Sequence, residues 1–113
     1  MARTALTVNA VVETGTTLSA TSANADGHSL VNTARANQLF LYVNNGGGSS
    51  INVTIQTPGT VRGLAIADLV VAVGAGAIKL IGPFDPSFYN QASGTVYVDF
   101  SSVTSVTVAA FKI

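Results

Sequence analysis

Short stretches in which apolar and polar residues alternate recur along the chain, a period of two that is typical of β-strands with one buried face. The clearest pair lies between Leu39 and Thr57, on either side of the glycine-rich segment 44–50. We predict that this region forms a β-hairpin with the glycine-rich segment as its tip. Because Leu39–Val43 is apolar on both faces, this strand should be central in its sheet and covered on both sides.

Two weaker patterns precede the hairpin. Ala5–Val12 alternates and predicts a strand, either at a sheet edge or as an arm that reaches a neighbouring molecule. The polar, turn-rich segment 14–37 predicts short strands near Thr16–Ala20 and Ser29–Asn32, joined by a tight turn at Asp26-Gly27. If these strands are absent, the segment is a surface loop that is available for contacts.

The second half of the chain alternates again. We predict strands at Leu69–Val73, Ala77–Ile81, Thr95–Phe100 and Ser105–Ile113. The segment Arg62–Asp68 could form one helical turn, although a helix of this length is not stable alone. A turn of 3₁₀ helix at Ser87–Asn90 would place Phe88 against one end of the core.

Together these elements amount to about eight or nine short strands and no long helix. The pattern predicts an all-β fold, either an antiparallel β-sandwich or a jelly-roll-like small barrel. At 113 residues we expect a single β domain over residues 1–113, with residues 1–12 as an N-terminal arm or edge strand. The chain begins with Met and has neither a signal peptide nor a membrane-length apolar run, so we expect a complete protein made in a cytoplasm, with no membrane partner.

Charged residues make up only 9% of the chain, and five basic residues balance five acidic ones. So few charges give little protection against association, and we expect neighbouring molecules to cover much of the surface. Nucleic-acid binding is disfavoured because it needs clustered basic residues, and those of this chain are scattered: Arg3, Arg35, Arg62, Lys79 and Lys112. The absence of cysteine excludes disulfides, thiolate metal sites and cysteine nucleophiles.

No group of residues has the pattern of a catalytic site. His28, the sole histidine, follows Asp26 and Gly27 in a polar turn, where we expect it to be exposed. No serine lies in a nucleophile-elbow motif. The Gly46–Gly48 run lacks the lysine and the following helix of a phosphate-binding loop, so we interpret it as the tip of the predicted hairpin.

Cofactor, metal and sugar sites are equally unsupported. Gly74-x-Gly76 lacks the third glycine of a dinucleotide site. A Ca²⁺ site needs several carboxylates close together, and three of the chain's aspartates lie in separate segments: Asp68, Asp85 and Asp99. Aromatic residues that could stack on sugars lie on predicted strands and are more simply core or interface: Phe40, Tyr42, Tyr97 and Phe111. We therefore predict no catalytic, cofactor-binding or metal-ligating residues, and a chain that is not an enzyme.

Five segments carry, in this order, a resemblance to a known group of proteins. They are Leu41-x-Val43-x-Asn45-Gly46-Gly47-Gly48, Val53-Thr54-Ile55-x-Thr57-Pro58, Thr60-Val61-x-Gly63-Leu64-Ala65-Ile66-Ala67-Asp68, Ile81-Gly82-Pro83-Phe84 with Tyr89-Asn90, and Ser102–Ala110. Between about Gln38 and Ile113 the chain resembles small all-β head proteins of tailed bacteriophages. No functional residues are carried over from that group.

The resemblance implies a virion structural protein, in the first place a capsid decoration (cement) protein that stabilises the phage head by binding across capsid subunits. The implied partners are the phage major capsid protein and further copies of the chain, as a homo-oligomer such as a trimer. The implied location is the capsid surface of the virion, after synthesis in the host cytoplasm. The alternatives are a head–tail connector or tail component and, with less support, a glycan-binding module. The glycine-rich loop 45–50 is a candidate contact site.

Overall fold

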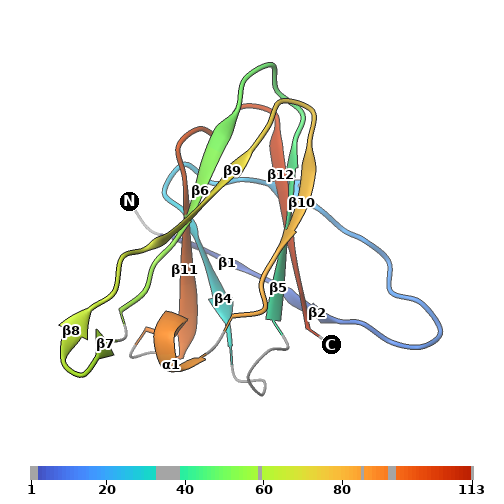
Figure 1. The fold of residues 1–113 in the computed structure, drawn as a ribbon. Helices are drawn as coiled ribbons and strands as arrows, with labels where there is room; N and C mark the ends of the chain where they lie inside the picture. Colours follow the sequence, from blue (N-terminus) through green and yellow to red (C-terminus); the bar gives the residue numbers. More distant parts are fainter. Residues whose placement is uncertain (1–2, 33–38, 59, 85, 92–93, 113) are drawn as a thin grey trace.

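The structure is a computed structural model that describes residues 3–32, 39–58, 60–84, 86–91 and 94–112 (Figure 1). These residues form twelve strands and one four-residue helix. In chain order the elements are β1 (Thr4–Leu6), β2 (Val8–Ala10), β3 (Thr21–Ser22), β4 (His28–Val31), β5 (Leu39–Asn45), β6 (Ile51–Ile55), β7 (Thr60–Val61), β8 (Leu64–Ala65), β9 (Leu69–Val73), β10 (Ile78–Ile81), α1 (Pro86–Tyr89), β11 (Thr95–Phe100) and β12 (Val106–Lys112).

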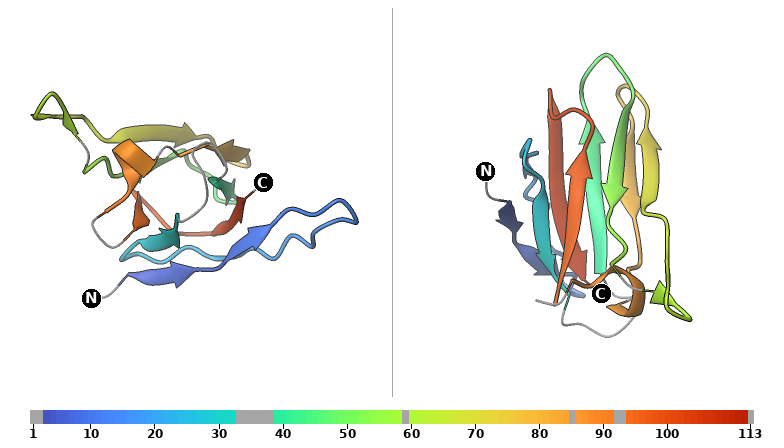
Figure 2. Two further views of the ribbon diagram at one scale, coloured as in Figure 1. Left: turned by 90° about the horizontal axis from the view of Figure 1, so that it is seen from below. Right: turned by 90° about the vertical axis from the view of Figure 1, so that its left-hand side faces the viewer.

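Most of the strands form two sheets that enclose a common interior (Figure 2). Sheet A has the order β1-β4-β11-β6-β9, and sheet B has the order β10-β5-β12-β2, with β3 also paired to β12. Strands β7 and β8 form a small separate hairpin. The predicted all-β, sandwich-like fold is confirmed, although both sheets are mixed, because β1 pairs with β4 and β2 pairs with β12 in parallel. Among the described residues, no helix is long and apolar enough to cross a membrane.

Alternate residues of the strands fill the interior. Val43 of sheet B and Ile55 and Val98 of sheet A are all 0% exposed and belong to one hydrophobic cluster. Ile55 and Val98 are neighbours across the β6–β11 pair, so sheet A presents a continuous apolar inner face. Each such side chain contributes about 1.5–3 kcal/mol when it is fully buried. The alternation in the sequence is therefore the direct cause of the two-layer fold.

The hairpin predicted between Leu39 and Thr57 is wrong. β5 and β6 lie in different sheets, and the glycine-rich segment carries the chain from one sheet to the other (Figure 1). β5 pairs with β10 and β12, whereas β6 pairs with β9 and β11. The alternating faces of the two strands are buried equally well when they oppose each other across the core. β5 is central in sheet B as predicted, but Phe40 and Tyr42 on its outer face are only partly covered.

The strand predicted at Ala5–Val12 is two strands, β1 and β2, on either side of Thr7. β1 lies at the edge of sheet A and β2 at the edge of sheet B, so the chain changes sheets at Thr7 and closes one side of the sandwich. Residues 11–20, here called the protruding loop, then extend away from the sheets (Figure 2, left).

Of the two short strands predicted within residues 14–37, one is wrong and one is confirmed. The protruding loop contains no strand, so the strand near Thr16–Ala20 is wrong, because only Leu18 in that stretch offers an apolar anchor. The turn at Asp26-Gly27 and the strand that follows are confirmed. Gly27 has a φ of 87°, which suits glycine, and its N–H donates to the carbonyl of Asn24 at 2.9 Å.

The remaining elements follow the sequence more closely. Strands β9, β10, β11 and β12 lie within one residue of their predicted bounds. Arg62–Asp68 is not helical, because Arg62 and Gly63 form the turn of the β7–β8 hairpin with φ of 53° and 78°. The helical turn predicted at Ser87–Asn90 is present as α1, but Phe88 is 37% exposed and does not fill the core. Phe84, which is 1% exposed, takes that place.

Candidate functional site

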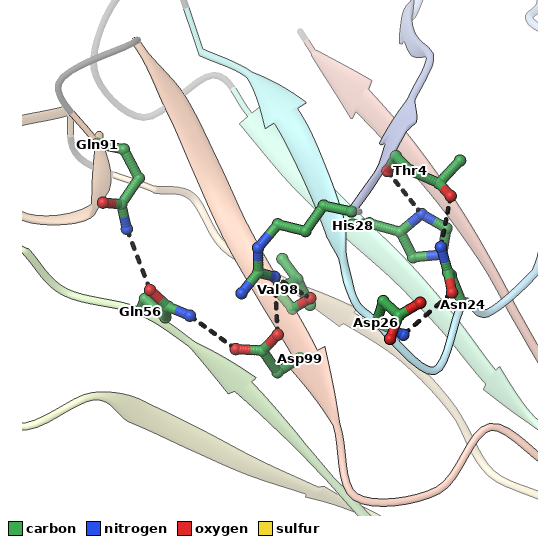
Figure 3. A network of polar contacts seen from close by, with 9 residues as sticks. Thr4, Asn24, Asp26, His28, Gln56, Gln91, Val98 and Asp99 are labelled. Carbon is green, nitrogen blue, oxygen red and sulfur yellow. Dashed lines mark hydrogen bonds and ion pairs between the residues drawn. The ribbon is translucent and has the colours of Figure 1, made fainter. Parts of the chain in front are cut away.

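His28 begins β4 and is only 2% exposed. Its Nδ1 lies 3.1 Å from the carbonyl oxygen of Thr4, and its Nε2 accepts a 3.0 Å hydrogen bond from the backbone N–H of Asn24 (Figure 3). Since a carbonyl can only accept, Nδ1 carries the proton and the ring is the neutral Nδ1–H tautomer. His28 thus joins β1 to the turn that precedes β4.

The prediction that His28 is exposed is therefore wrong. Parallel pairing places Thr4 of β1 opposite His28 of β4, and the ring of Phe100 packs edge-on at 5.9 Å. A general base needs a nitrogen that can reach a substrate proton. Both nitrogens of His28 are bonded to backbone groups of this chain, so the residue acts here as a structural link between β1 and the turn.

Acid should weaken the folded state through His28. Burial lowers its pKa below the ordinary value of 6.5; the hydrogen bond to the Thr4 carbonyl opposes this shift, and the charge of Arg3 adds to it. Protonation would place an N–H at Nε2, directly against the N–H of Asn24. The unfolded chain therefore takes up this proton at a higher pH than the folded chain does. The contribution of His28 to the free energy of unfolding is complete above about pH 6.5, the pKa of the unfolded chain's histidine. It is lost as the pH falls toward the lower pKa that His28 has in the folded chain.

We expect the urea concentration at the midpoint of unfolding to fall as the pH is lowered from 7.5 to 5. Circular dichroism measures this midpoint at pH intervals of about half a unit. The His28→Gln variant has no titrating group at this position, and its midpoint should change less over the same range. An equal change in both proteins would show that His28 is not the source.

A second polar network joins Arg3, the residue before β1, to Asp99 of β11 and to Gln56, the residue after β6. Arg3 forms an ion pair with Asp99 (Nη1 to Oδ1, 2.7 Å), and its guanidinium carbon lies 4.3 Å from the centre of the Tyr97 ring. Gln56 donates to Asp99 Oδ2 at 2.8 Å (Figure 3). Burial alone would raise the pKa of Asp99, but the hydrogen bonds from Arg3 and Gln56 and the charge of Arg3 outweigh it and hold the pKa below its usual value. Asp99 is therefore an ionised structural carboxylate at neutral pH.

The glycine-rich segment is fixed at its base by Asn45, which is 0% exposed. The Asn45 Nδ2 donates to the carbonyls of Ser49, Val73 and Gly74 at 2.8, 3.0 and 3.2 Å. Its Oδ1 accepts from the N–H of Gly47 at 3.1 Å. These bonds attach the glycine-rich segment to the end of β9. They also satisfy the hydrogen-bonding capacity of these backbone groups within the chain.

Of the three aspartates that lie in separate segments of the sequence, the two described ones have separate partners. Asp68 accepts from the backbone N–H of Thr57 at 3.0 Å, Asp99 is paired with Arg3, and Asp85 lies outside the described residues. Within the part of the chain that the structure describes, no group of three or more His, Cys, Asp or Glu could hold a metal ion.

An apolar groove lies on the outer face of sheet B, beside the protruding loop. Its sheet wall is formed by Phe40, Tyr42, Leu80 and Phe111. Its loop wall includes Val11, Val12 and Leu18. The groove, here called the outer groove, has a volume of about 470 Å³, and the described residues that line it include no charged side chain. It can hold an apolar group or a segment of another chain.

Sequence reasoning did not identify the outer groove or the burial of His28 and Asn45. A signal for the groove was present, because Leu39–Val43 is apolar on both faces and the Val11-Val12 pair continues beyond the end of a strand. No comparable signal marks the buried polar residues, whose partners lie on distant segments. No family model, no curated protein and no solved structure matches the chain.

Proposed function

We propose that the chain is a capsid decoration (cement) protein of a tailed-bacteriophage head, which stabilises the head by binding across capsid subunits. The observation that carries this proposal is the set of large apolar side chains that face outward from a small domain with few charges. Their exposed fractions run from 37% to 72%, and among the described residues they are Val11, Val12, Leu18, Val31, Leu64, Val70, Ile78, Leu80 and Phe88. Such a surface gains free energy when neighbouring molecules cover it.

Three further features support the proposal. The resemblance to phage head proteins extends over residues 38–113. Only 9% of the residues are charged, so few ions lose their hydration when the surface is covered. Strands β9 and β10 lie at sheet edges and carry exposed apolar residues, Val70 (55%) and Leu80 (68%), so a neighbour could add backbone hydrogen bonds to side-chain contacts.

The mechanism is physical. A specific contact buries about 1,200–2,000 Å² in total. A decoration protein makes such contacts at every equivalent position of a shell, so modest individual affinities combine into strong stabilisation of the whole particle. The rigid two-sheet body would transmit the load between the capsid subunits that it bridges.

The test is co-sedimentation of the purified chain with phage heads that lack it. We expect saturable binding at hundreds of copies per head, and a higher temperature of head disruption when the sites are filled. Saturation at about six or twelve copies would instead favour a head–tail connector. Failure to bind the heads at any concentration would remove the proposal, and glycan-array binding in that case would favour a sugar-binding module.

A further inference from the structure

A cavity of about 420 Å³ is lined by residues of α1 and of the neck of the β7–β8 hairpin, which lie at the same end of the domain (Figure 1). The chain leaves sheet A at Thr57 and returns at Asp68, since Ile55 and Leu69, just inside these positions, are paired between β6 and β9. The described lining of this cavity, here called the end cavity, combines one carboxylate, one hydroxyl, two aromatic rings and aliphatic groups.

Oxygen acceptors outnumber donors at the neck of the hairpin. Thr57 Oγ1 lies 2.9 Å from the carbonyl oxygen of Ile66 and 3.0 Å from that of Ala67. It also lies 3.2 Å from Asp68 Oδ1, which accepts from the backbone N–H of Thr57 at 3.0 Å. A hydroxyl has a single proton, so it can donate a full hydrogen bond to only one of these three oxygens. The wall of the end cavity therefore carries lone pairs that the two donors of Thr57 do not satisfy.

The charge of the end cavity is negative. Asp68 is exposed, and it is the only charged residue in the described lining. Among the described residues the one ion pair joins Arg3 to Asp99, so Asp68 has no ionic partner in that part of the chain. A cation that enters the cavity is therefore attracted, and the surplus oxygens favour a cation that carries several N–H donors.

Two aromatic residues of α1 also line the end cavity. Phe88 is 37% exposed and does not fill the core. Tyr89 packs edge-to-face against the buried ring of Phe84, with 5.5 Å between the ring centres, which restrains the Tyr89 ring. Aromatic faces attract organic cations and also contact their apolar stems. A cationic ligand would thus give the exposed Phe88 ring a role that packing within the domain does not.

We propose that the end cavity binds the guanidinium group of an arginine. This planar group has five N–H donors for the surplus acceptors, a permanent positive charge for Asp68, and a face that stacks on aromatic rings. A metal ion matches the cavity less well, because a single carboxylate supplies little charge and the Phe88 ring supplies no ligand. The inference goes beyond the proposed role on a phage head, because it assigns a ligand class to one particular cavity.

The direct test is titration of the ¹⁵N-labelled chain with N-acetylarginine amide at constant ionic strength, followed by NMR. We expect saturable shifts of the backbone amide signals of Thr57, Asp68 and Tyr89, with a dissociation constant on the order of 1 mM. N-acetylcitrulline amide has nearly the same shape without the charge, and it should bind about tenfold more weakly or worse.

Free arginine is the third ligand, and it identifies the source of the guanidinium group. Binding no tighter than that of N-acetylarginine amide indicates an arginine side chain of a partner protein, because the blocked analogue already contains every group that is recognised. Binding at least about tenfold tighter indicates the free amino acid, whose additional charged groups would then contribute.

Two variants and a control locate the binding. Asp68→Asn should weaken the binding of N-acetylarginine amide about tenfold, and Phe88→Ala should weaken it about two- to fivefold. The matched control is Asp26→Asn, which removes the same charge from the turn that precedes β4 and should leave the binding unchanged. The NMR spectrum of each variant shows at the same time whether it is folded.

Equal binding of the arginine and citrulline analogues overturns the proposal. Unchanged binding in Asp68→Asn, or shifts that do not include the residues of the end cavity, also overturns it. These outcomes are separate from those of the head-binding experiment. A chain that binds the arginine analogue but not the heads refutes only the proposed function, and a chain that binds the heads but not the analogue refutes only this inference.

Discussion

Replacing Asn45 by aspartate should lower the free energy of unfolding by about 3–5 kcal/mol, the cost of an uncompensated buried charge. The Nδ2 group of Asn45 donates to three backbone carbonyls, those of Ser49, Val73 and Gly74, and the side chain is 0% exposed. In Asn45→Asp an oxygen of the same size faces these three oxygens. A domain of this size is typically stable by only about 5–15 kcal/mol, so much of the folded population should be lost.

The matched control is Asn44→Asp, which makes the same chemical change one residue away. Asn44 lies on the partly exposed outer side of β5, so its substitution should change stability by about 0.5 kcal/mol or less. Urea unfolding followed by circular dichroism measures both variants. In Asn45→Asp part of the loss should be recovered at low pH, because a protonated carboxyl can donate one hydrogen bond again. Similar losses in the two variants would refute this role for Asn45.

Replacing Gly27 by alanine should cost about 2–4 kcal/mol through backbone strain and overpacking together. Gly27 has a φ of 87°, and a Cβ at this position would lie 2.7 Å from the carbonyl oxygen of Val98 and 2.6 Å from Asp99 Oδ1, as well as against the guanidinium of Arg3. The Arg3 side chain can move, but the Val98 carbonyl is part of the β11 backbone. The turn and the β1–β4 edge would therefore have to separate from β11.

Gly63→Ala is the control that separates backbone strain from overpacking. Gly63 has a φ of 78°, close to that of Gly27, but nothing lies within 4 Å of a Cβ built there. Its substitution should carry only the conformational cost of a positive φ, about 1–2 kcal/mol. Thermal unfolding of the two variants gives the difference, which measures the close approach of the turn to Arg3 and β11. If Gly27→Ala lowers the stability no more than Gly63→Ala does, the close approach of the turn to Arg3 and β11 adds no cost to the substitution.

The strands themselves were largely predictable from the sequence, because alternation records which side chains face the core. Thr95–Phe100 is a strand with its predicted bounds, and its residues Val96 and Val98 are buried. Pairing was not predictable in the same way. Alternation in β5 and β6 requires that their apolar faces be buried, but it does not specify whether the two strands lie side by side or face each other across the core. The predicted hairpin failed on that ambiguity.

The buried polar residues depend on contacts between distant segments. His28 is buried because β1, 24 residues earlier, supplies the Thr4 carbonyl to its ring. Asn45 finds two of its three acceptors 28 and 29 residues away. A polar residue next to a glycine is usually exposed, so the local sequence favoured the wrong interpretation. The outer groove was half predictable, since the apolar outer face of β5 is in the sequence, but the position of the protruding loop beside it is not.

The order of strands has a consequence for synthesis. β11 lies between β4 and β6 in sheet A, and β12 lies between β5 and β2 in sheet B, so each sheet depends on a strand from the last 19 residues of the 113-residue sequence. A nascent chain that stops before Thr95 has both sheets divided, with the inner faces of β5 and β6 uncovered. Domains fold as units, so both sheets can be completed only after β11 and β12 have left the ribosome.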